Sequence, residues 1–494
     1  MRYFRLGKAD LLNGVERKLG LKTTAQKWGA FVVLLGVCVM GYLLLVKPVI
    51  GLEDNGDFLR VTATVGLTDL HSDKSYQDKH IGFAHILYAY GDIRPGGYVS
   101  TQFIPVLVAK AVGWVLPGPH FDIRVLGVIY ASGLLTSFYL VVRYFGMRTW
   151  WANAIMVFLL LFVFVDVGYV AYFNSFYGEP MTYVSLMLMI AIVLKLSRAE
   201  ETNYRWAILF MVVAILTTGS KTQAAPVAVA CLLIAFRLFR LGDSVRIFDV
   251  DQWKQTIKRW TIALLAFSFI FYLASPSLID RINQYQAVFY GILKDSPNPE
   301  QDLRSMGFNP EWAVNAGTDF FTPYAPIPQQ DPRFAEFYKK VGFSKIIGFY
   351  LTHPTRFWSK LEAAADQAWT IRPYYLGNYE EAEGKPSGAI SSTFSTWSDW
   401  KNHYHPDGFV WILLLYGCYG GGLAWEYRRA RKSSELLVPD IFAVVAMIGA
   451  ISFVVAFIGS GEADFAKHLF LFTVCLDVML ISGVLWLLRR FARG

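Results

Sequence analysis

Three carboxylates and an arginine lie close together directly after the first long apolar run of the chain. They are Glu53, Asp54, Asp57 and Arg60. Burying these side chains in lipid would be costly, so we expect them just outside the hydrocarbon, at the end of a membrane helix. In a helical segment, residues three apart share a face, which would bring Asp54 and Asp57 together. Two acids held on one face at a membrane boundary indicate a functional site rather than a solvated linker.

Two other interpretations of this cluster remain open. The acids could simply mark the polar end of a helix, although three of them with an Asn-Gly break are denser than a helix end requires. They could also hold a divalent cation, which favours oxygen ligands. Because the segment has no fixed cation-loop pattern, we predict no metal and no other cofactor.

Charged side chains also stand where later apolar runs begin. Glu179 lies beside Pro180 in an aromatic turn, where it could accept hydrogen bonds from sugar hydroxyls or simply favour the positive end of a helix. Lys221 and the pair Lys467-His468 each open a further apolar run. Unpaired N–H groups at a helix start, together with a basic side chain, form an anion site suited to phosphate. Snorkelling of the lysines to the membrane interface is the alternative.

Four more acidic residues complete the set of charged candidates. Glu462 and Asp464 come just before Lys467 and could pair with the cations there or help to bind a substrate. Asp166 and Asp477 lie within apolar runs, a position that suggests a role in transport. The sequence alone assigns no role to Asp477.

The composition is that of an integral membrane protein. The 494 residues are 54% hydrophobic and 17% charged, and the mean hydropathy is +0.37. Average soluble domains carry about 25% charged residues. The net charge of +8 does not predict nucleic-acid binding, because the basic residues cluster beside apolar runs, as membrane topology explains. The four cysteines all lie in apolar segments, so we expect no disulfide framework.

A spanning helix needs roughly 20 apolar residues, and the chain offers about ten such stretches. They are residues 28–50, 121–143, 150–170, 181–197, 204–219, 222–240, 259–276, 408–427, 438–459 and 468–488. We therefore predict an all-α polytopic membrane protein with about ten transmembrane helices. With ten spans, the basic clusters all fall on the same side as the basic N-terminus, which the positive-inside rule makes cytoplasmic. Both termini are then cytoplasmic.

One further apolar segment, residues 98–117, tests this count. A span there would give eleven and put the later basic clusters outside, so we predict an interfacial helix within the first outer loop instead. The long outer loops are then residues 51–120 and 277–407. The chain divides into a transmembrane core (1–276), a large and mainly helical extracytoplasmic loop domain (277–407) and C-terminal transmembrane helices (408–494).

Four short motifs, in order along most of the chain, are similar to those of a known family. They are residues 53–60, the Tyr-Gly-Glu-Pro at 177–180, residues 285–291 with 294–297, and residues 461–470. Together with the arrangement of spans and loops, they resemble the C-type glycosyltransferase superfamily (GT-C). More narrowly, they look like the WsfD-like hexose transferases of bacterial glycan biosynthesis. Such a resemblance implies a multi-spanning enzyme that uses a polyprenyl-phosphate-linked sugar.

The resemblance also implies roles for individual residues. The superfamily places its catalytic base on an acid of the first outer loop, here Asp57 or Asp54. An inverting transfer would follow, in which the carboxylate takes a proton from an acceptor hydroxyl that attacks the anomeric carbon. Lys221, Lys467 or His468 would stabilise the departing polyprenyl phosphate.

The remaining candidates would bind the substrates. They are Glu53, Arg60, Glu179, Tyr285, Arg372, Glu462 and Asp464. The large outer loop, with Tyr285 and Arg372, would shape a cleft for the acceptor, which is a glycan or a lipid. The expected partners are thus a polyprenyl-phosphate sugar donor, this acceptor and membrane lipids, and the expected location is the bacterial cytoplasmic membrane.

Two alternative functions share many of these features. Polysaccharide polymerases and ligases also combine many spans with a large outer loop. A transporter or lipid-linked sugar flippase belongs to another functional class and should concentrate its essential charges at the bilayer midplane. Most candidate charges in this chain collect at one membrane face, which favours an enzyme.

Overall fold

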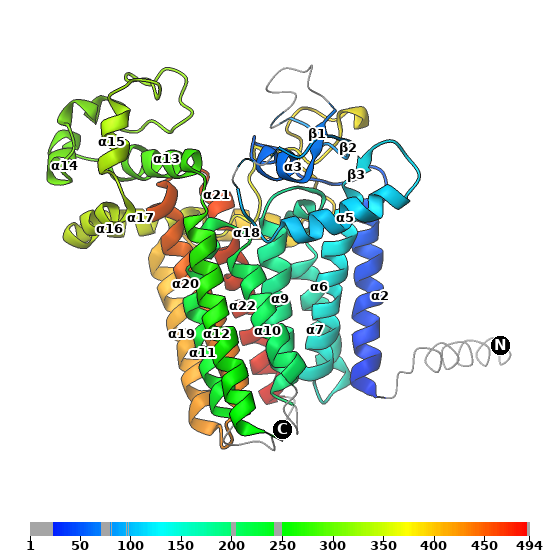
Figure 1. Cartoon of the computed structure of the whole chain (residues 1–494). Coiled ribbons are helices and arrows are strands. Elements are labelled where there is room, and N and C mark those ends of the chain that lie inside the picture. Colours follow the sequence, from blue (N-terminus) through cyan, green and yellow to red (C-terminus); the bar gives the residue numbers. More distant parts are fainter. Residues whose placement is uncertain are drawn as a thin grey trace.

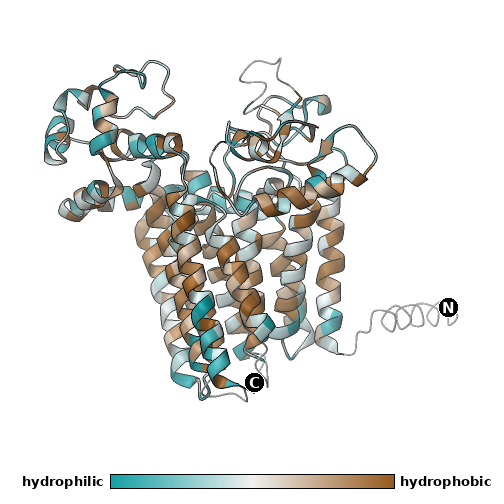
Figure 2. Cartoon of the chain, viewed as in Figure 1, coloured by the Kyte–Doolittle hydropathy of each residue, from teal (hydrophilic) through white to brown (hydrophobic). Residues whose placement is uncertain are grey.

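The protein is a helical bundle that carries two lobes on one of its ends (Figure 1). The computed structural model describes residues 23–70, 80, 82–94, 96, 98–198, 204–241 and 249–491. The helices of the bundle are α2 (Thr24–Leu45), α6 (Arg124–Phe145), α7 (Trp150–Phe164), α9 (Glu179–Leu196), α10 (Tyr204–Thr218), α11 (Val227–Leu241), α12 (Val250–Leu273), α19 (Phe409–Arg429), α20 (Leu437–Ser460) and α22 (Phe470–Phe491). Apolar residues dominate the bundle, and polar residues gather toward its two ends (Figure 2).

Each of the ten stretches predicted to span the membrane contains a helix, but the count of ten spans is not confirmed. Among the described residues, six helices are long and apolar enough to cross a membrane, or up to eight if each of two bent pairs is one span. Helices α10 and α11 have 15 residues each, fewer than the roughly 20 that a span needs. The chain is a multi-pass membrane protein.

The predicted span 150–170 bends by 51° after α7. One carboxylate oxygen of Asp166 accepts a hydrogen bond from the amide of Gly168 (2.7 Å). The other accepts from the amides of Trp397 and Ser398 (both 3.0 Å). Asp166 therefore caps the short helix that follows the bend and also the start of a helix from the large loop, which gives the break a physical cause.

Basic residues collect at the end of the bundle away from the lobes. Helices α6, α9, α11, α19 and α22 run toward that end (Figure 1), and each carries lysine or arginine in its last turn. Helices α2, α7, α10, α12 and α20 run the other way and carry none in theirs. The prediction that the basic clusters share one side of the bundle is confirmed for these helix ends.

The first lobe contains the first long loop, which is not entirely helical. Its elements are α3 (Leu59–Val65), α5 (Phe103–Val115), β1 (Leu67–Asp69), β2 (Leu87–Tyr90) and β3 (Phe121–Asp122). The three strands form an antiparallel sheet in the order β1-β2-β3, so the protein is mostly helical rather than all-α. Helix α5 lies crosswise over the ends of the bundle helices (Figure 1), within the segment that the sequence predicts to be interfacial.

The large loop contributes to both lobes. Its first part builds the second lobe, whose apolar core continues into the bundle helices α19, α20 and α22. The elements of this lobe are α13 (Ser277–Tyr285), the π-helical turn η3 (Gln286–Ile292), α14 (Pro299–Ser305), η4 (Pro310–Asn315), α15 (Phe334–Lys340), α16 (Phe343–Thr352) and α17 (Pro354–Gln367). Its later part pairs with the first loop. There, the amide of Glu53 donates to the carbonyl of Gly377 (3.0 Å), and that of Ala84 donates to Tyr379 (2.9 Å).

The last helix of the large loop, α18 (Thr396–Tyr404), is anchored in the bundle. Lys401 Nζ lies 2.8 Å from Asp477 Oδ1, and both side chains are fully buried. The other carboxylate oxygen of Asp477 accepts hydrogen bonds from the Tyr169 hydroxyl (2.6 Å) and the Trp397 indole (2.8 Å). Asp477, to which the sequence assigns no role, therefore holds the end of the large loop on α22.

Candidate functional site

A buried lysine joins the two segments that the sequence singles out. Lys467 lies in the short helix α21 (Phe465–His468), between α20 and α22. Its ammonium forms an ion pair with Asp57 and lies 3.6 Å from Asp464 Oδ2 and 4.7 Å from the centre of the Tyr177 ring. Only 4% of the lysine side chain is exposed. The first loop and the connection between α20 and α22 are thus in contact through the Lys467 ammonium.

Asp57 is held as an anion by two basic side chains. Besides Lys467, Arg60 Nη2 lies 2.8 Å from Asp57 Oδ1. Burial alone would raise the pKa of Asp57, but the charges of Lys467 and Arg60 outweigh it and lower the pKa below its ordinary value. An acid with a lowered pKa is charged throughout the physiological range but is a weak base while both partners stay in place.

Asp54 has a different task, and it does not share a helical face with Asp57. Helix α3 begins only at Leu59, so the two acids lie in the turn before it. Asp54 Oδ1 accepts hydrogen bonds from the amides of Gly56 (2.7 Å) and Phe58 (3.0 Å). The expectation of a shared face is therefore wrong, because Asp54 uses its carboxylate to close the turn that presents Asp57.

Glu53 is almost completely buried, with 1% of its surface exposed. Neither of its carboxylate oxygens makes a hydrogen bond of normal geometry within the described residues. Burial raises the pKa of Glu53 to about 9, so this carboxyl is protonated at neutral pH. Its backbone carbonyl accepts a hydrogen bond from the Tyr177 hydroxyl (2.7 Å), which fixes the start of the acidic segment.

Glu179 and Lys221 pair with each other. Lys221 Nζ lies 2.6 Å from Glu179 Oε1, and only 2% of the glutamate side chain is exposed. The second oxygen, Oε2, is buried without a hydrogen-bond partner among the described residues. Lys221 directly precedes the 3-10 turn η2 (Thr222–Ala224), as expected for a basic side chain at a helical start.

His468 differs from the cation expected from the sequence. Its Nδ1 lies 2.6 Å from the side-chain nitrogen of Gln223 and 3.0 Å from its oxygen. Burial, followed by the nearby charges of Lys221 and Lys467, holds the pKa of His468 well below its usual value. The imidazole is therefore neutral and presents a hydrogen-bonding edge rather than a charge.

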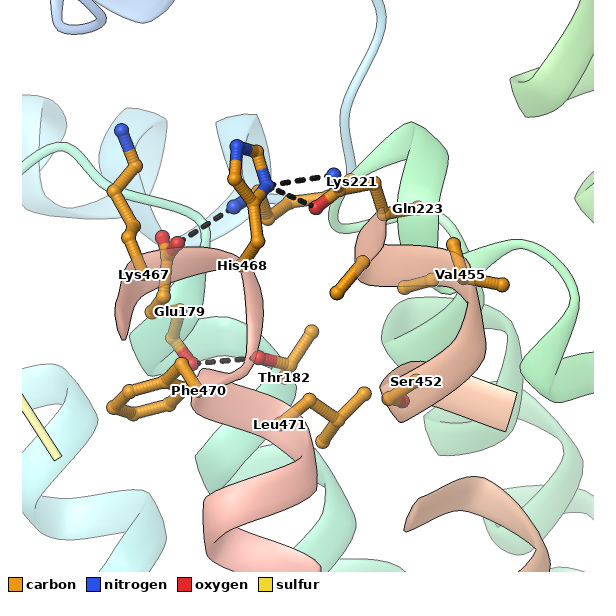
Figure 3. A pocket seen from close by; sticks show the side chains of 12 residues that line it. Glu179, Thr182, Lys221, Gln223, Ser452, Val455, Lys467, His468, Phe470 and Leu471 are labelled. Carbon is orange, nitrogen blue, oxygen red and sulfur yellow. Dashed lines mark hydrogen bonds and ion pairs between the residues drawn. The ribbon is translucent and has the colours of Figure 1, made fainter. Parts of the chain in front are cut away.

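The basic residues Lys221 and Lys467, together with Glu179 and His468, line a pocket (Figure 3), whereas Asp57 lies beside it through its pairing with Lys467. Its empty volume is about 380 Å³, which includes the part open to solvent. The polar lining residues are Glu179, Thr182, Lys221, Gln223, Ser452, Lys467 and His468, and the apolar ones are Ala224, Val455, Ala456, Phe470 and Leu471. Helices α9, α20 and α22 supply more than half of these residues, so the ends of the bundle helices form much of the pocket wall. Among the described residues, no group of three histidine, cysteine or acidic side chains is placed to hold a metal ion.

Three predicted binding residues have their contacts elsewhere. Tyr285 is buried in the core of the second lobe, where its hydroxyl bonds with Thr318 (2.7 Å) and Asn315 (3.0 Å). Arg372 donates to the Asn378 side chain (2.7 Å) and to the carbonyl of Ser391 (2.5 Å). Glu462 binds two lysines of the large loop.

Two residues that organise the site were not among the predicted site residues, although one of them, Tyr177, begins the Tyr-Gly-Glu-Pro motif. Tyr177 connects Lys467 to the first loop, because its ring faces the Lys467 ammonium and its hydroxyl accepts a hydrogen bond from the backbone amide of Asn55 (3.0 Å). Gln223 fixes the imidazole of His468. Tyr177 lies in the turn before the predicted span 181–197, and Gln223 lies at the start of the predicted span 222–240, so their position near the acidic loop was the available signal.

A comparison with protein families matches residues 17–493 to the model described as "YfdI N-terminal transmembrane domain". The chain belongs to this family. No curated protein sequence matches. Among solved structures, the chain is similar to the archaeal oligosaccharyltransferase AglB from Archaeoglobus fulgidus, solved with an inhibitory peptide and a dolichol-phosphate. That match has 12% sequence identity and a TM-score of 0.37, and it covers 95% of this chain. It covers 52% of AglB, so the chain spans about half of that protein's length.

Proposed function

We propose that the protein is a membrane glycosyltransferase. It would move a sugar from a polyprenyl-phosphate donor to an acceptor glycan or lipid, with inversion at the anomeric carbon. The observation that carries the proposal is the pair of Asp57 and Lys467 beside a pocket lined by a second lysine and by apolar residues of the bundle. The site thus combines a carboxylate, cations suited to a phosphate and apolar side chains of the bundle helices.

The pocket suits a ligand with a phosphate and an apolar chain. Lys221 and Lys467 would bind the phosphate oxygens, and the neutral His468 would donate a hydrogen bond. Val455 and Leu471 lie on the apolar part of the lining, where the first units of a lipid chain would fit. Ser452 is buried in the same pocket, and its hydroxyl has no hydrogen-bond partner among the described residues. A polar group of the ligand would satisfy it.

The chemical step follows from these positions. Asp57 would take the proton of an acceptor hydroxyl, whose oxygen would form the new bond to the anomeric carbon. The bond from that carbon to the phosphate oxygen would break, and its electron pair would stay on the polyprenyl phosphate. Lys467 and Lys221 would stabilise the charge that develops there. We assign the base to Asp57 because Asp54 is occupied by the turn.

Donor binding would also activate the base. The charges of Lys467 and Arg60 keep the basicity of Asp57 low. A phosphate that draws Lys467 toward itself would weaken this pairing and raise the pKa of the carboxylate. Asp57 would then become a better proton acceptor only when a donor is present.

Topology supports an extracytoplasmic site. The basic last turns lie opposite the lobes, and the positive-inside rule would place them in the cytoplasm. The pocket, the first loop and the large loop would then face outward. In a bacterial cytoplasmic membrane, both termini would be cytoplasmic.

The alternative of a transporter is less well supported. Asp166 and Asp477, the acids within apolar runs, are occupied by helix caps and by the Lys401 ion pair. A polysaccharide polymerase or ligase would use a similar site and differs in its acceptor. The narrower resemblance to WsfD-like hexose transferases stays a prediction.

The experiment is a transfer assay with the purified full chain in liposomes. Polyprenyl-phosphate carrying a radiolabelled hexose is supplied together with a cell-envelope glycan fraction. Appearance of free polyprenyl phosphate and of label in the glycan would support the proposal. Movement of intact donor across the bilayer without cleavage would contradict it and indicate a flippase.

A further inference from the structure

The second lobe contacts the turn that precedes Lys467. This turn, residues 461–464, joins α20 to α21 and therefore sets the position of Lys467. Its backbone is unusual, because Gly461 has φ +58° and Asp464 has φ +49°. Asp464 turns toward the first loop, where its carboxylate accepts from the Asn55 amide group (3.5 Å). Glu462 turns the other way.

Glu462 gives both of its carboxylate oxygens to lysines of the large loop. Oε1 lies 2.5 Å from Lys360 Nζ, and Oε2 forms an ion pair with Lys294. Lys360 lies on α17, and only 2% of its side chain is exposed. Its Nζ also lies 2.9 Å from Asp295 Oδ2. A buried lysine between two acids fixes the distance between the turn and the second lobe.

The backbones approach closely at the same place. The amide of Glu462 donates to the carbonyl of Tyr290 (3.3 Å) in the π-helical turn η3. A Cβ atom added to Gly461 would lie 2.4 Å from the carbonyl oxygen of Gln286 and 2.7 Å from the amide nitrogen of Gly291. A side chain at position 461 is therefore excluded by backbone atoms as well as by its φ.

We propose that Glu462 is a positioning residue that couples the large loop to the site, and not a ligand of the substrate. Glu462, Lys360 and Lys294 form a junction between the second lobe and the turn 461–464. Lys467 follows Glu462 by five residues, so the junction also holds the segment that contains this lysine. The inference rests on the proposed function only for its effect on catalysis. A shift of the second lobe would move the turn, and with it the lysine that pairs with Asp57.

This junction gives the large loop a way to affect the chemistry. An acceptor bound by the second lobe would be sensed at the site without touching the pocket. Because misplacing a reacting group by about 1 Å can cost roughly 10²-fold in rate, small movements of the turn would suffice. The mechanical link is also compatible with the side-chain exposure of Glu462, which is only 10%.

The first experiment measures position and does not need the enzyme to be active. Spin labels are placed at Tyr324, which is 94% exposed on the large loop, and at Trp114, which is 71% exposed on α5. We expect one narrow distance distribution in the otherwise unchanged protein and a broadened or shifted one in E462Q and K360M. D331N, which breaks an exposed pair with Arg333 in the same loop, serves as the matched control and should behave like the parent.

The second experiment measures transfer in the same variants. We expect E462Q and K360M each to lower kcat by roughly 10- to 100-fold, with little change in the KM of the acceptor. The double variant should be no slower than the worse single one, because both break one junction. E462D should recover part of the rate.

The outcomes separate this inference from the proposed function. Unchanged distances in E462Q and K360M would overturn the inference. So would unchanged distances with a raised acceptor KM in E462Q alone, which would make Glu462 a substrate ligand. Altered distances in a protein whose parent form shows no transfer would leave the junction in place and contradict the glycosyltransferase proposal.

Discussion

The ammonium of Lys467 and the carboxylate of Asp57 lie 410 positions apart in the chain and form a part-buried ion pair. The pair joins the first loop to the connection between α20 and α22, and a pocket at the end of the bundle adjoins it. In the proposed reaction, one partner binds the leaving phosphate and the other takes the proton of the acceptor.

Removing the charge of Lys467 should impair transfer strongly. Lys467→Met takes away a group proposed to stabilise the leaving phosphate, and it leaves Asp57 and Asp464 without their shared counter-charge. We expect kcat to fall by roughly 10²- to 10³-fold, measured as release of polyprenyl phosphate. Lys340→Met, which breaks an exposed pair with Glu336, is the control. An unchanged rate in Lys467→Met would remove this lysine from the mechanism.

The pair of Lys221 and Glu179 should matter for both stability and activity. Lys221→Met leaves the buried Glu179 without its partner, and breaking such a pair costs about 3–5 kcal/mol. The double variant Lys221→Met/Glu179→Gln removes both charges and should recover part of the stability without recovering transfer. Thermal unfolding in detergent micelles, followed alongside the transfer assay, measures the two effects. Full recovery of transfer in the double variant would refute a role for Lys221 in phosphate binding.

Glu53 should make stability fall as pH rises. Burial raises the pKa of Glu53 to about 9 in the folded protein, from a usual value of 4.5. Between these two values the folded state binds more protons than the unfolded state, so this residue's contribution to stability decreases with increasing pH. Glu53→Gln removes that contribution. We expect the variant to gain melting temperature relative to the parent at pH 9 and to match it more closely at pH 5. A difference independent of pH would contradict the assignment.

The ion pair of Lys401 and Asp477 should be structural. Asp477→Asn leaves a fully buried ammonium without its counter-charge, at a cost of about 3–5 kcal/mol. We expect a lowered melting temperature and faster proteolysis near α18, with the KM for the donor unchanged in the molecules that stay folded. Normal stability combined with loss of donor movement across liposomes would instead revive the transport hypothesis.

The general layout was predictable because it depends on local composition. Hydropathy located the bundle helices, and the run of acids after the first of them marked the first loop. The basic last turns of α6, α9 and α22 followed from the charge pattern alone. Lys221 was recognisable as a basic residue at a helical start, whereas Lys467 lies in the last turn of α21 rather than at the start of α22; both line the pocket.

The division of labour among the acids was not predictable. Asp54 and Asp57 are the same residue type three positions apart, yet one closes a turn and the other meets Lys467. That difference depends on a contact across 410 positions. Glu462 and Asp464 likewise differ, since Glu462 contacts lysines of the large loop and Asp464 contacts Asn55, in a turn where Gly461 and Asp464 have positive φ. The sheet in the first loop escaped notice since its strands have only two to four residues.

The most direct test of the account compares Asp57→Asn with Asp54→Asn in the purified full chain. Both changes keep the size of the side chain, and equal melting temperatures would show that both variants fold. The measurement is the rate at which labelled hexose leaves polyprenyl phosphate for the acceptor. We predict a loss of roughly 10²- to 10⁴-fold for Asp57→Asn and a much smaller loss for Asp54→Asn. Transfer at the parent rate in Asp57→Asn would contradict the central claim.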